Sequence, residues 1–325
     1  MRKDLQSWWS STNVSNAKAK VQKSAKKTAI SIFIGLLLTG ISFIILSPLI
    51  DMISKSFMDI QDFYNPLVYL IPKTLSLYNY KSAIQFLDYK NSLIFTSLFV
   101  SVITILQAFI CSLVGYGFAR FRFPYSNVLF GLVILTIVIP PQTFMVKMYM
   151  QFRFFDIFNI ATLIRGEPLN LLNTPFPLLL LTLFGMGLRS GLYIYMFRQF
   201  FRGLPKEIEE AAFIDGAGRF YTYFKVMLPN AVPNIITVML FSFVWQFNDT
   251  FYSSTFMTKY NFMSTMLSTV TTNFSASIGT IKVDPNLATL VTYAAVLLAI
   301  APIIIIYLLL QKYFIEGIER SGIVG

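Results

Sequence analysis

Histidine is absent from this 325-residue chain, and cysteine occurs once, as Cys111. The absence of histidine excludes histidine-based acid–base chemistry and histidine metal sites. A single cysteine excludes a disulfide framework, and its position inside an apolar run is typical of a small buried hydrophobe. The sequence therefore predicts no catalytic residue and no metal site on this chain.

Charged residues are also scarce. They make up 13% of the chain, about half the share that is usual in soluble domains, whereas apolar residues make up 55%. Of the 15 acidic residues, Asp249 alone falls within a long apolar run. The phosphate-binding loop G-x-x-x-x-G-K-[ST] is missing, so the chain cannot hydrolyse ATP by itself. This composition predicts an all-α, polytopic membrane protein.

Six apolar runs are long enough to cross a bilayer, which takes about 20 residues in a helix. We place these runs near residues 28–50, 92–118, 127–149, 176–200, 231–253 and 287–311. Six crossings put both termini on the same side of the membrane. The prediction is thus a six-helix transmembrane protein whose core spans residues 92–311.

The distribution of basic residues orients these runs. Residues 1–27 form a basic tail beside the first run, which marks the cytoplasmic side and favours membrane lipid as a partner. The net charge of +11 is not gathered in a compact basic domain, so nucleic acid is not expected as a partner. Residues 51–91 become an extracytoplasmic loop with one or two short helices, residues 254–286 a second outer loop, and residues 312–325 a cytoplasmic tail.

Polar side chains inside the runs are candidates for a solute path. Arg189 lies in the fourth run and Asp249 in the fifth, and charges inside a bilayer are costly unless they face protein or water. They either line the path, pair with each other, or pair with a partner chain. Gln142 and Asn248 are uncharged candidates, but for each of them, as for Gln107, the sequence favours helix–helix hydrogen bonding over contact with a solute.

Residues 204–229 form a polar segment between the fourth and fifth runs. Pro205 suits the start of a helix, acids follow in its first turn, and Gly216 suits a left-handed C-terminal cap. An apolar stripe recurs at helical spacing, on Leu204, Ile208, Ala211 and Ala212. The segment is predicted to hold a short amphipathic helix outside the membrane, and an ordinary interfacial helix would fit the same pattern.

The order of residues in this segment resembles the cytoplasmic coupling loop of permease subunits in ABC importers. The residues that carry the resemblance are Glu210, Ala211, Ala212, Asp215, Gly216, Leu228 and Pro229. Val226 stands where isoleucine is usual. Pro140-Pro141 is expected to break the third run, as in the maltose and multiple-sugar branch of the family. Further matches to that branch are Asn91-Ser92, the run from Gly115 to Arg120, Arg198-Gln199-Phe200-Phe201, Trp245 and Gln311-Lys312-Tyr313-Phe314.

The resemblance implies a type I ABC importer permease fold with a cytoplasmic coupling helix in the bacterial plasma membrane. It implies a transport subunit, not an enzyme, that imports a sugar or oligosaccharide. The implied partners are two ATP-binding subunits that carry ATP and Mg, a second homologous permease chain and an extracytoplasmic sugar-binding protein. No cofactor is expected on this chain. The family's usual Trp-Asn pair is interrupted here by Gln246-Phe247, which weakens the transfer of sugar-contact roles.

Three other functions remain as alternatives. An ABC permease for a non-carbohydrate solute would share the same loop. An ion-coupled carrier would usually show more intramembrane titratable groups and an internal repeat, and neither is present. A membrane-embedded enzyme would need His, Cys or paired carboxylates within the membrane.

Overall fold

The computed structural model describes residues 2–277 and 284–322, with the side chains of residues 23, 26–277 and 284–312. The regular elements of this part of the chain are helices, and its only β-pairing is two isolated antiparallel bridges, Met58 with Leu75 and Phe155 with Leu169. The chain divides into two compact units, Met1–Ser76 and Leu77–Gly325. The all-α prediction is confirmed for the described residues.

The first unit contains a long helix and a short returning segment. Helix α1 (Arg2–Ser56) includes an apolar stretch, Lys26–Ser56, that is long enough to span a membrane. Helix α2 (Ile60–Phe63) follows, and the Asp62 carboxylate accepts hydrogen bonds from the Thr74 amide at 2.9 Å and hydroxyl at 3.2 Å. The hydrogen bond from the Thr74 backbone amide holds the pKa of Asp62 below its ordinary value.

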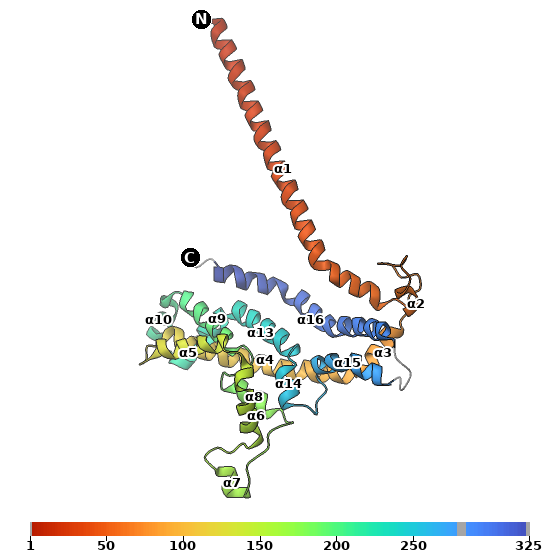
Figure 1. Cartoon of the computed structure of the whole chain (residues 1–325). Coiled ribbons are helices and arrows are strands. Elements are labelled where there is room, and N and C mark those ends of the chain that lie inside the picture. Colours follow the sequence, from red (N-terminus) through yellow and green to blue (C-terminus); the bar gives the residue numbers. More distant parts are fainter. Residues whose placement is uncertain (1, 278–283, 323–325) are drawn as a thin grey trace. The chain divides into compact units, whose positions relative to one another are not determined.

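The second unit is a helical bundle centred on α4 (Figure 1). Helix α4 packs most extensively against α9 and also against α13, and α16 packs against α13, α15 and α3. The elements are α3 (Tyr78–Phe86), α4 (Tyr89–Arg120), α5 (Ser126–Val138), η1 (Pro141–Phe144), α6 (Met145–Arg153), α7 (Ile160–Arg165), α8 (Phe176–Leu183), α9 (Ser190–Gly203), α10 (Lys206–Ile214), α11 (Arg219–Thr222), η2 (Tyr223–Met227), α12 (Leu228–Asn230), α13 (Val232–Phe247), α14 (Phe251–Phe256), α15 (Met263–Ser277) and α16 (Pro285–Gly322).

The structure supports fewer clear membrane crossings than the sequence predicts. In the described residues, three helical stretches are long and apolar enough to span, namely Lys26–Ser56, Tyr89–Arg120 and Pro285–Lys312. Two bent pairs raise the number to five if each is one crossing. Ser126–Val138 and Pro141–Arg153 meet at 100°, at the predicted break by Pro140 and Pro141. Arg219–Asn230 and Val232–Phe247 meet at 77°.

The continuous helix predicted for residues 176–200 is wrong. Helix α8 ends at Leu183 and α9 begins at Ser190, so the predicted span is broken in its middle. Gly185 has φ +70° and Arg189 has φ +62°, and neither value fits a right-handed helix. The spacing of Gly185 and Gly187 is a break signal that the apolar composition of the run concealed.

Two further outcomes concern the outer loops. The short helices predicted in residues 51–91 are present as α2 and α3. Residues 254–286, predicted as a loop, contain the end of α14 and all of α15, and residues 278–283 lie outside the described part. Val270 and Phe274 of α15 are buried in a core with Phe243 of α13 and Val291 of α16. The polar residues of α15 therefore occupy one face of a packed helix.

Helices α4 and α9 approach each other closely at Gly115. A Cβ atom at that position would lie 2.6 Å from Cβ of Phe197, 3.0 Å from the backbone nitrogen of Arg198 and 3.1 Å from the backbone oxygen of Ile194. Phe197 is fully buried, so these neighbours have little room to move. The glycine lets the two helices pack as one unit beside the 204–229 loop.

Candidate functional site

The 204–229 loop contains the helix that the sequence predicts. Pro205 precedes α10 with φ −55°, and Glu207 and Glu209 lie in the first turn, where acids complement the helix dipole. Gly216 has φ +83°, and its N–H donates to the Phe213 carbonyl at 3.0 Å. The Ala217 N–H donates to the Ala212 carbonyl at 2.9 Å, which completes a left-handed cap. The predicted cap role of Gly216 is confirmed.

The outer surface of this loop is exposed and apolar. Ile214 is 86% exposed and Phe220 is 74% exposed, with Phe213 and Tyr221 also exposed. Of the predicted coupling residues, those on the exposed surface are Glu210, Ala211, Asp215, Gly216 and Pro229, while Ala212 and Leu228 are half-buried. Exposed apolar groups gathered beside acids are typical of a protein interaction surface. The structure thus places five of the seven predicted residues on one accessible loop.

One of the acids predicted in the first turn, Glu209, lies on the buried side of α10, and this burial was not predicted. Glu209 is 7% exposed, and its Oε1 atom accepts a hydrogen bond from the Tyr116 hydroxyl at 2.5 Å. Its Oε2 atom lies 3.3 Å from Arg120 Nε, as an ion pair without hydrogen-bond geometry. Arg120 Nη2 donates to the Leu204 carbonyl at 2.9 Å. We call Tyr116, Arg120 and Glu209 the Glu209 junction.

A sequence signal exists for the α4 half of this junction only. Tyr116 and Arg120 are four residues apart at the end of α4 and share one helix face. On α10, Glu209 and Ala212 are three residues apart and both face inward, whereas Ala211 is exposed. The buried face of α10 is therefore rotated by about one residue from the apolar stripe that the sequence predicts. Glu209, an acid, lies at the centre of this buried face.

Arg189 lies in the break between α8 and α9. It is exposed, and its guanidinium carbon lies 4.4 Å from the centre of the Trp245 ring of α13, which is a cation–π contact. Within the described residues, Arg189 forms no ion pair with Asp249. Arg189 therefore lies at the start of α9 and not within a continuous helix.

Asp249 lies beyond the end of α13 and caps the next helix. Its carboxylate accepts hydrogen bonds from the Tyr252 amide at 3.1 Å and the Ser253 amide at 3.0 Å. Asp249 therefore lies outside α13, which ends at Phe247, and not inside a continuous helix over residues 231–253. Asn248 is exposed, and its side-chain amide donates to the Val244 carbonyl one turn earlier at 2.9 Å. Both residues follow Trp245, whose ring Arg189 contacts, within four positions of the chain.

A neutral polar cluster ties α4 to α13 and to the α8–α9 break. Gln107 is fully buried, and its Nε2 atom donates to the Leu188 carbonyl and to Ser190 Oγ, both at 2.8 Å. Its Oε1 atom accepts from Ser242 Oγ at 2.6 Å and from Gln246 Nε2 at 3.3 Å. We call Gln107, Ser190, Ser242 and Gln246 the Gln107 junction. It serves helix packing, as the sequence analysis favoured for Gln107.

Gln142 stands apart from the other predicted path residues. It lies in η1 at the bend between α5 and α6 and is exposed. The described contacts do not join it to Arg189, Asn248 or Asp249. The structure therefore brings three of the four predicted path residues into one region and leaves the fourth outside it.

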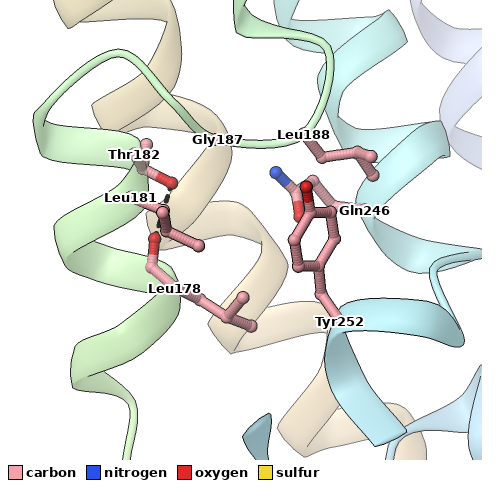
Figure 2. Close-up of a pocket in the computed structure, with 7 residues that line it drawn as sticks. All are labelled: Leu178, Leu181, Thr182, Gly187, Leu188, Gln246 and Tyr252. Atoms are coloured by element: carbon pink, nitrogen blue, oxygen red, sulfur yellow. Dashed lines mark hydrogen bonds between the residues drawn. The ribbon is translucent and has the colours of Figure 1, made fainter. Parts of the chain in front are cut away.

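A small cavity lies beside the Gln107 junction (Figure 2). Its lining residues are Leu178, Leu181, Thr182, Gly187, Leu188, Gln246 and Tyr252. In Figure 2 the Tyr252 ring and the Gln246 amide face Leu178 and Thr182 across the opening. The cavity volume of about 10 Å³ is room for about one water molecule, so this cavity alone does not accommodate a sugar.

Comparison with known proteins gives a family match over most of the bundle. Residues 111–320 match the family described as binding-protein-dependent transport system inner membrane component. This range includes the 204–229 loop, α9 and α13. Members of the family are transport subunits and not enzymes, and their transport depends on an ATPase and a binding protein.

Individual relatives agree with this match. A probable ABC transporter permease protein of Pyrococcus horikoshii is 30% identical over 288 residues, which cover 86% of this chain and 91% of the relative. The melibiose/raffinose/stachyose import permease protein MelC of Bacillus subtilis is 27% identical over 258 residues, which cover 79% of this chain and 84% of MelC.

A solved structure supports the fold. The crystal structure of a bacterial ABC transporter involved in the import of the acidic polysaccharide alginate contains a chain that matches with a TM-score of 0.64 and 21% identity. The match covers 88% of this chain and 96% of that chain. Together with the family match, it confirms the resemblance that the loop residues indicated. The chain belongs to the family of inner membrane components of binding-protein-dependent transport systems, the permeases of ABC importers.

Proposed function

We propose that this chain forms half of the translocation path of an ATP-driven importer for a sugar or oligosaccharide. A second permease chain supplies the other half, and two ATP-binding subunits drive the pair. Several relatives carry names that specify such solutes, among them the arabinooligosaccharides transport system permease protein AraQ of Bacillus subtilis, at 26% identity. The extracytoplasmic partner is then a sugar-binding protein.

The exposed face of the 204–229 loop is the observation that carries the proposal. Ile214 and Phe220 present apolar surface, and Glu210 and Asp215 place acids beside it. A partner surface with a hydrophobic pocket and basic rim is complementary to this face. The ATP-binding subunit docks there, so Glu210, Ala211, Ala212, Asp215, Gly216, Leu228 and Pro229 couple ATP hydrolysis to transport.

Six crossings with both termini in the cytoplasm follow if α8 and α9 form one broken span. The two helices contain 8 and 14 residues. At 1.5 Å per residue, their combined length is about 33 Å, close to the thickness of the hydrocarbon core. Broken helices at mid-membrane are tolerated where they are buried in protein or line a cavity. The break at Arg189 then lies within the membrane, beside the path.

Arg189, Trp245 and Asn248 form the proposed solute-facing region of this chain, with Asp249 fixing its shape. An aromatic ring under a guanidinium group offers an apolar face together with several donors. Those groups suit a sugar ring with its hydroxyls. Gln142 remains a weaker candidate for the path, because it lies at a separate bend.

A matched pair of glycine substitutions tests the coupling role of the loop. Gly216 has φ +83°, which a β-branched residue adopts only under strain, whereas Gly218 has φ −73°, and a Cβ atom at either position meets no neighbour within 4 Å. We expect Gly216→Val to lose uptake and co-purification of the ATPase while the chain still inserts. Gly218→Val is the control and keeps both. Normal uptake by Gly216→Val would remove the coupling assignment.

An acidic or phosphorylated solute is the second candidate. A relative in Yersinia pestis is named as the sn-glycerol-3-phosphate transport system permease protein UgpE, at 27% identity. The exposed guanidinium of Arg189 suits an anionic group. Transport assays with neutral and acidic sugars decide between the candidates. If Arg189→Gln abolishes uptake of the acidic solute and spares the neutral one, the second candidate stands.

A further inference from the structure

We propose that Glu209 is a positioning residue that locks the coupling loop onto α4, so that movement of the loop is carried directly into the bundle. This inference rests on the proposed function of the 204–229 loop. It adds a role for the buried side of α10, which faces away from the docking surface. The Glu209 junction is the contact through which the movement passes.

The junction holds α10 at two points. Arg120 contacts the Leu204 carbonyl just before the helix and the Glu209 carboxylate one turn inside it. Tyr116 contacts the other carboxylate oxygen. Two groups from one face of α4 thus fix both the position and the rotation of α10. A loop attached by its chain ends alone would be free to pivot.

Packing around Tyr116 extends the same contact to other elements. Its ring lies 5.4 Å from the Phe201 ring of α9 and 5.1 Å from the Tyr223 ring of η2, centre to centre. The Tyr223 hydroxyl is 2.7 Å from Ser112 Oγ on α4. All four side chains are buried. The aromatic contacts confine the Tyr116 hydroxyl to the direction of Glu209.

Helix α4 is able to pass a displacement on because it is close-packed against α9. The contact at Gly115 lies one residue before Tyr116 and leaves no space for a Cβ atom. Interiors packed at this density transmit strain. Displacement of α10 therefore moves α4 and α9 together, including the Arg189 break at the start of α9.

The buried ion pair explains why a charged acid is present at this point. Replacing a buried pair with apolar residues is often neutral for stability, so its retention is better explained by a specific orientation. An apolar side chain at residue 209 would pack without fixing the rotation of α10. Tyr116 and Arg120 together allow only one orientation of the Glu209 carboxylate.

The test compares two isosteric substitutions on the complete transporter in liposomes. Glu209→Gln removes the charge, and Tyr116→Phe removes one hydroxyl. Glu207→Gln is the matched control, because Glu207 is exposed on the same helix. We measure sugar molecules imported per ATP hydrolysed. We expect this ratio to fall about tenfold for Glu209→Gln and by a smaller factor for Tyr116→Phe, within the usual range of coupling between sites. Glu207→Gln keeps the wild-type ratio.

The ratio separates coupling from folding, because loss of folded transporter lowers uptake and ATP hydrolysis in proportion. If Glu209→Gln does not fold, Tyr116→Phe alone decides the question. Wild-type ratios in both variants, or an equal fall in Glu207→Gln, would overturn the proposal. Loss of the ATPase subunit from Glu209→Gln would also overturn it, since Glu209 would then shape the docking surface. A failure of the proposed docking role would be seen in a different variant. In that case Gly216→Val would still co-purify with the ATPase subunit.

Discussion

Helix α4 carries two buried polar junctions. Both hold neighbouring elements against this helix, but they use different polar groups. The Glu209 junction, at the end of the helix, uses a carboxylate, a guanidinium group and a phenol. The Gln107 junction lies about two and a half turns earlier and uses neutral amides and hydroxyls. Charges are costly in the apolar layer and less so at its edge, whereas neutral groups can be satisfied at any depth. The chemistry of each junction therefore reports where it lies along the helix.

The largest difference between the two junctions is expected when the Glu209 junction loses its cation, Arg120. Arg120→Met leaves the Glu209 carboxylate buried without a positive partner, and removing one member of a buried pair costs about 3–5 kcal/mol. We expect a loss of this size in the free energy of unfolding in detergent. Arg122→Met is the control, because Arg122 is exposed two residues later. An equal loss in both variants would show that the pair has no special weight.

The close contact between the two junctions gives the next largest effect. Gly115→Ala places a Cβ atom 2.6 Å from Cβ of Phe197, and overpacking of this kind costs about 1–3 kcal/mol. Gly117→Ala meets no neighbour within 4 Å and is expected to be neutral or slightly stabilising. Thermal unfolding of the two variants measures the difference. A stable Gly115→Ala would mean that α4 and α9 separate without cost.

The neutral junction predicts a smaller loss. Gln107→Leu leaves the Leu188 carbonyl and two hydroxyl groups without their partner, and such groups in membrane proteins contribute about 1–2 kcal/mol. Gln199→Leu is the control, because Gln199 is exposed on α9. The same unfolding measurement applies. A loss for Gln107→Leu above that for Arg120→Met would reverse the ranking of the two junctions.

Asp156, a carboxylate outside the spans, can be compared with the buried carboxylate of Glu209. Asp156 accepts hydrogen bonds from the Thr162 hydroxyl and from the Ala161 amide at 2.8 Å, and the hydroxyl bond holds the pKa of Asp156 below its ordinary value. Because the folded-state pKa is lowered, the stabilisation is present above about pH 4 and is lost as pH falls through the folded-state pKa. We expect faster hydrogen exchange of the Ala161 amide at low pH, after correction for intrinsic rates. If the pH dependence of this exchange is the same in wild type and in Asp156→Asn, the stabilising role assigned to the Asp156 carboxylate is wrong.

The sequence predicts those parts of the fold that depend on local signals. The cap at Gly216, the break at Pro140 and the short helices α2 and α3 all follow from local signals in the sequence. The family resemblance was also carried by a short segment, and the family match confirms it. These features are set within about one helical turn.

Features that depend on distant contacts were not predicted. The pairing of Glu209 with Tyr116 joins residues 93 positions apart, and no local signal fixes the rotation of α10 on which it depends. Asp249 was placed in a span because an apolar run continues past it, while its hydrogen bonds to Tyr252 and Ser253 show a capping role. Arg189 was likewise placed in a continuous helix, because the apolar count of residues 176–200 outweighed two glycines.

The π-helical turn η2 sets the rotation of α11 about the helix axis relative to α13. A π-turn contains one residue more than an α-helical turn, and each residue corresponds to about 100° of rotation. Deleting one residue from Tyr223–Met227 would turn this element into a regular α-helix and rotate α11 by about that angle relative to α13. Arg219, which lies 5.3 Å over the Phe121 ring, would then face elsewhere. The orientation of the loop thus depends on the length of the chain at this turn, and a single codon is enough to change it.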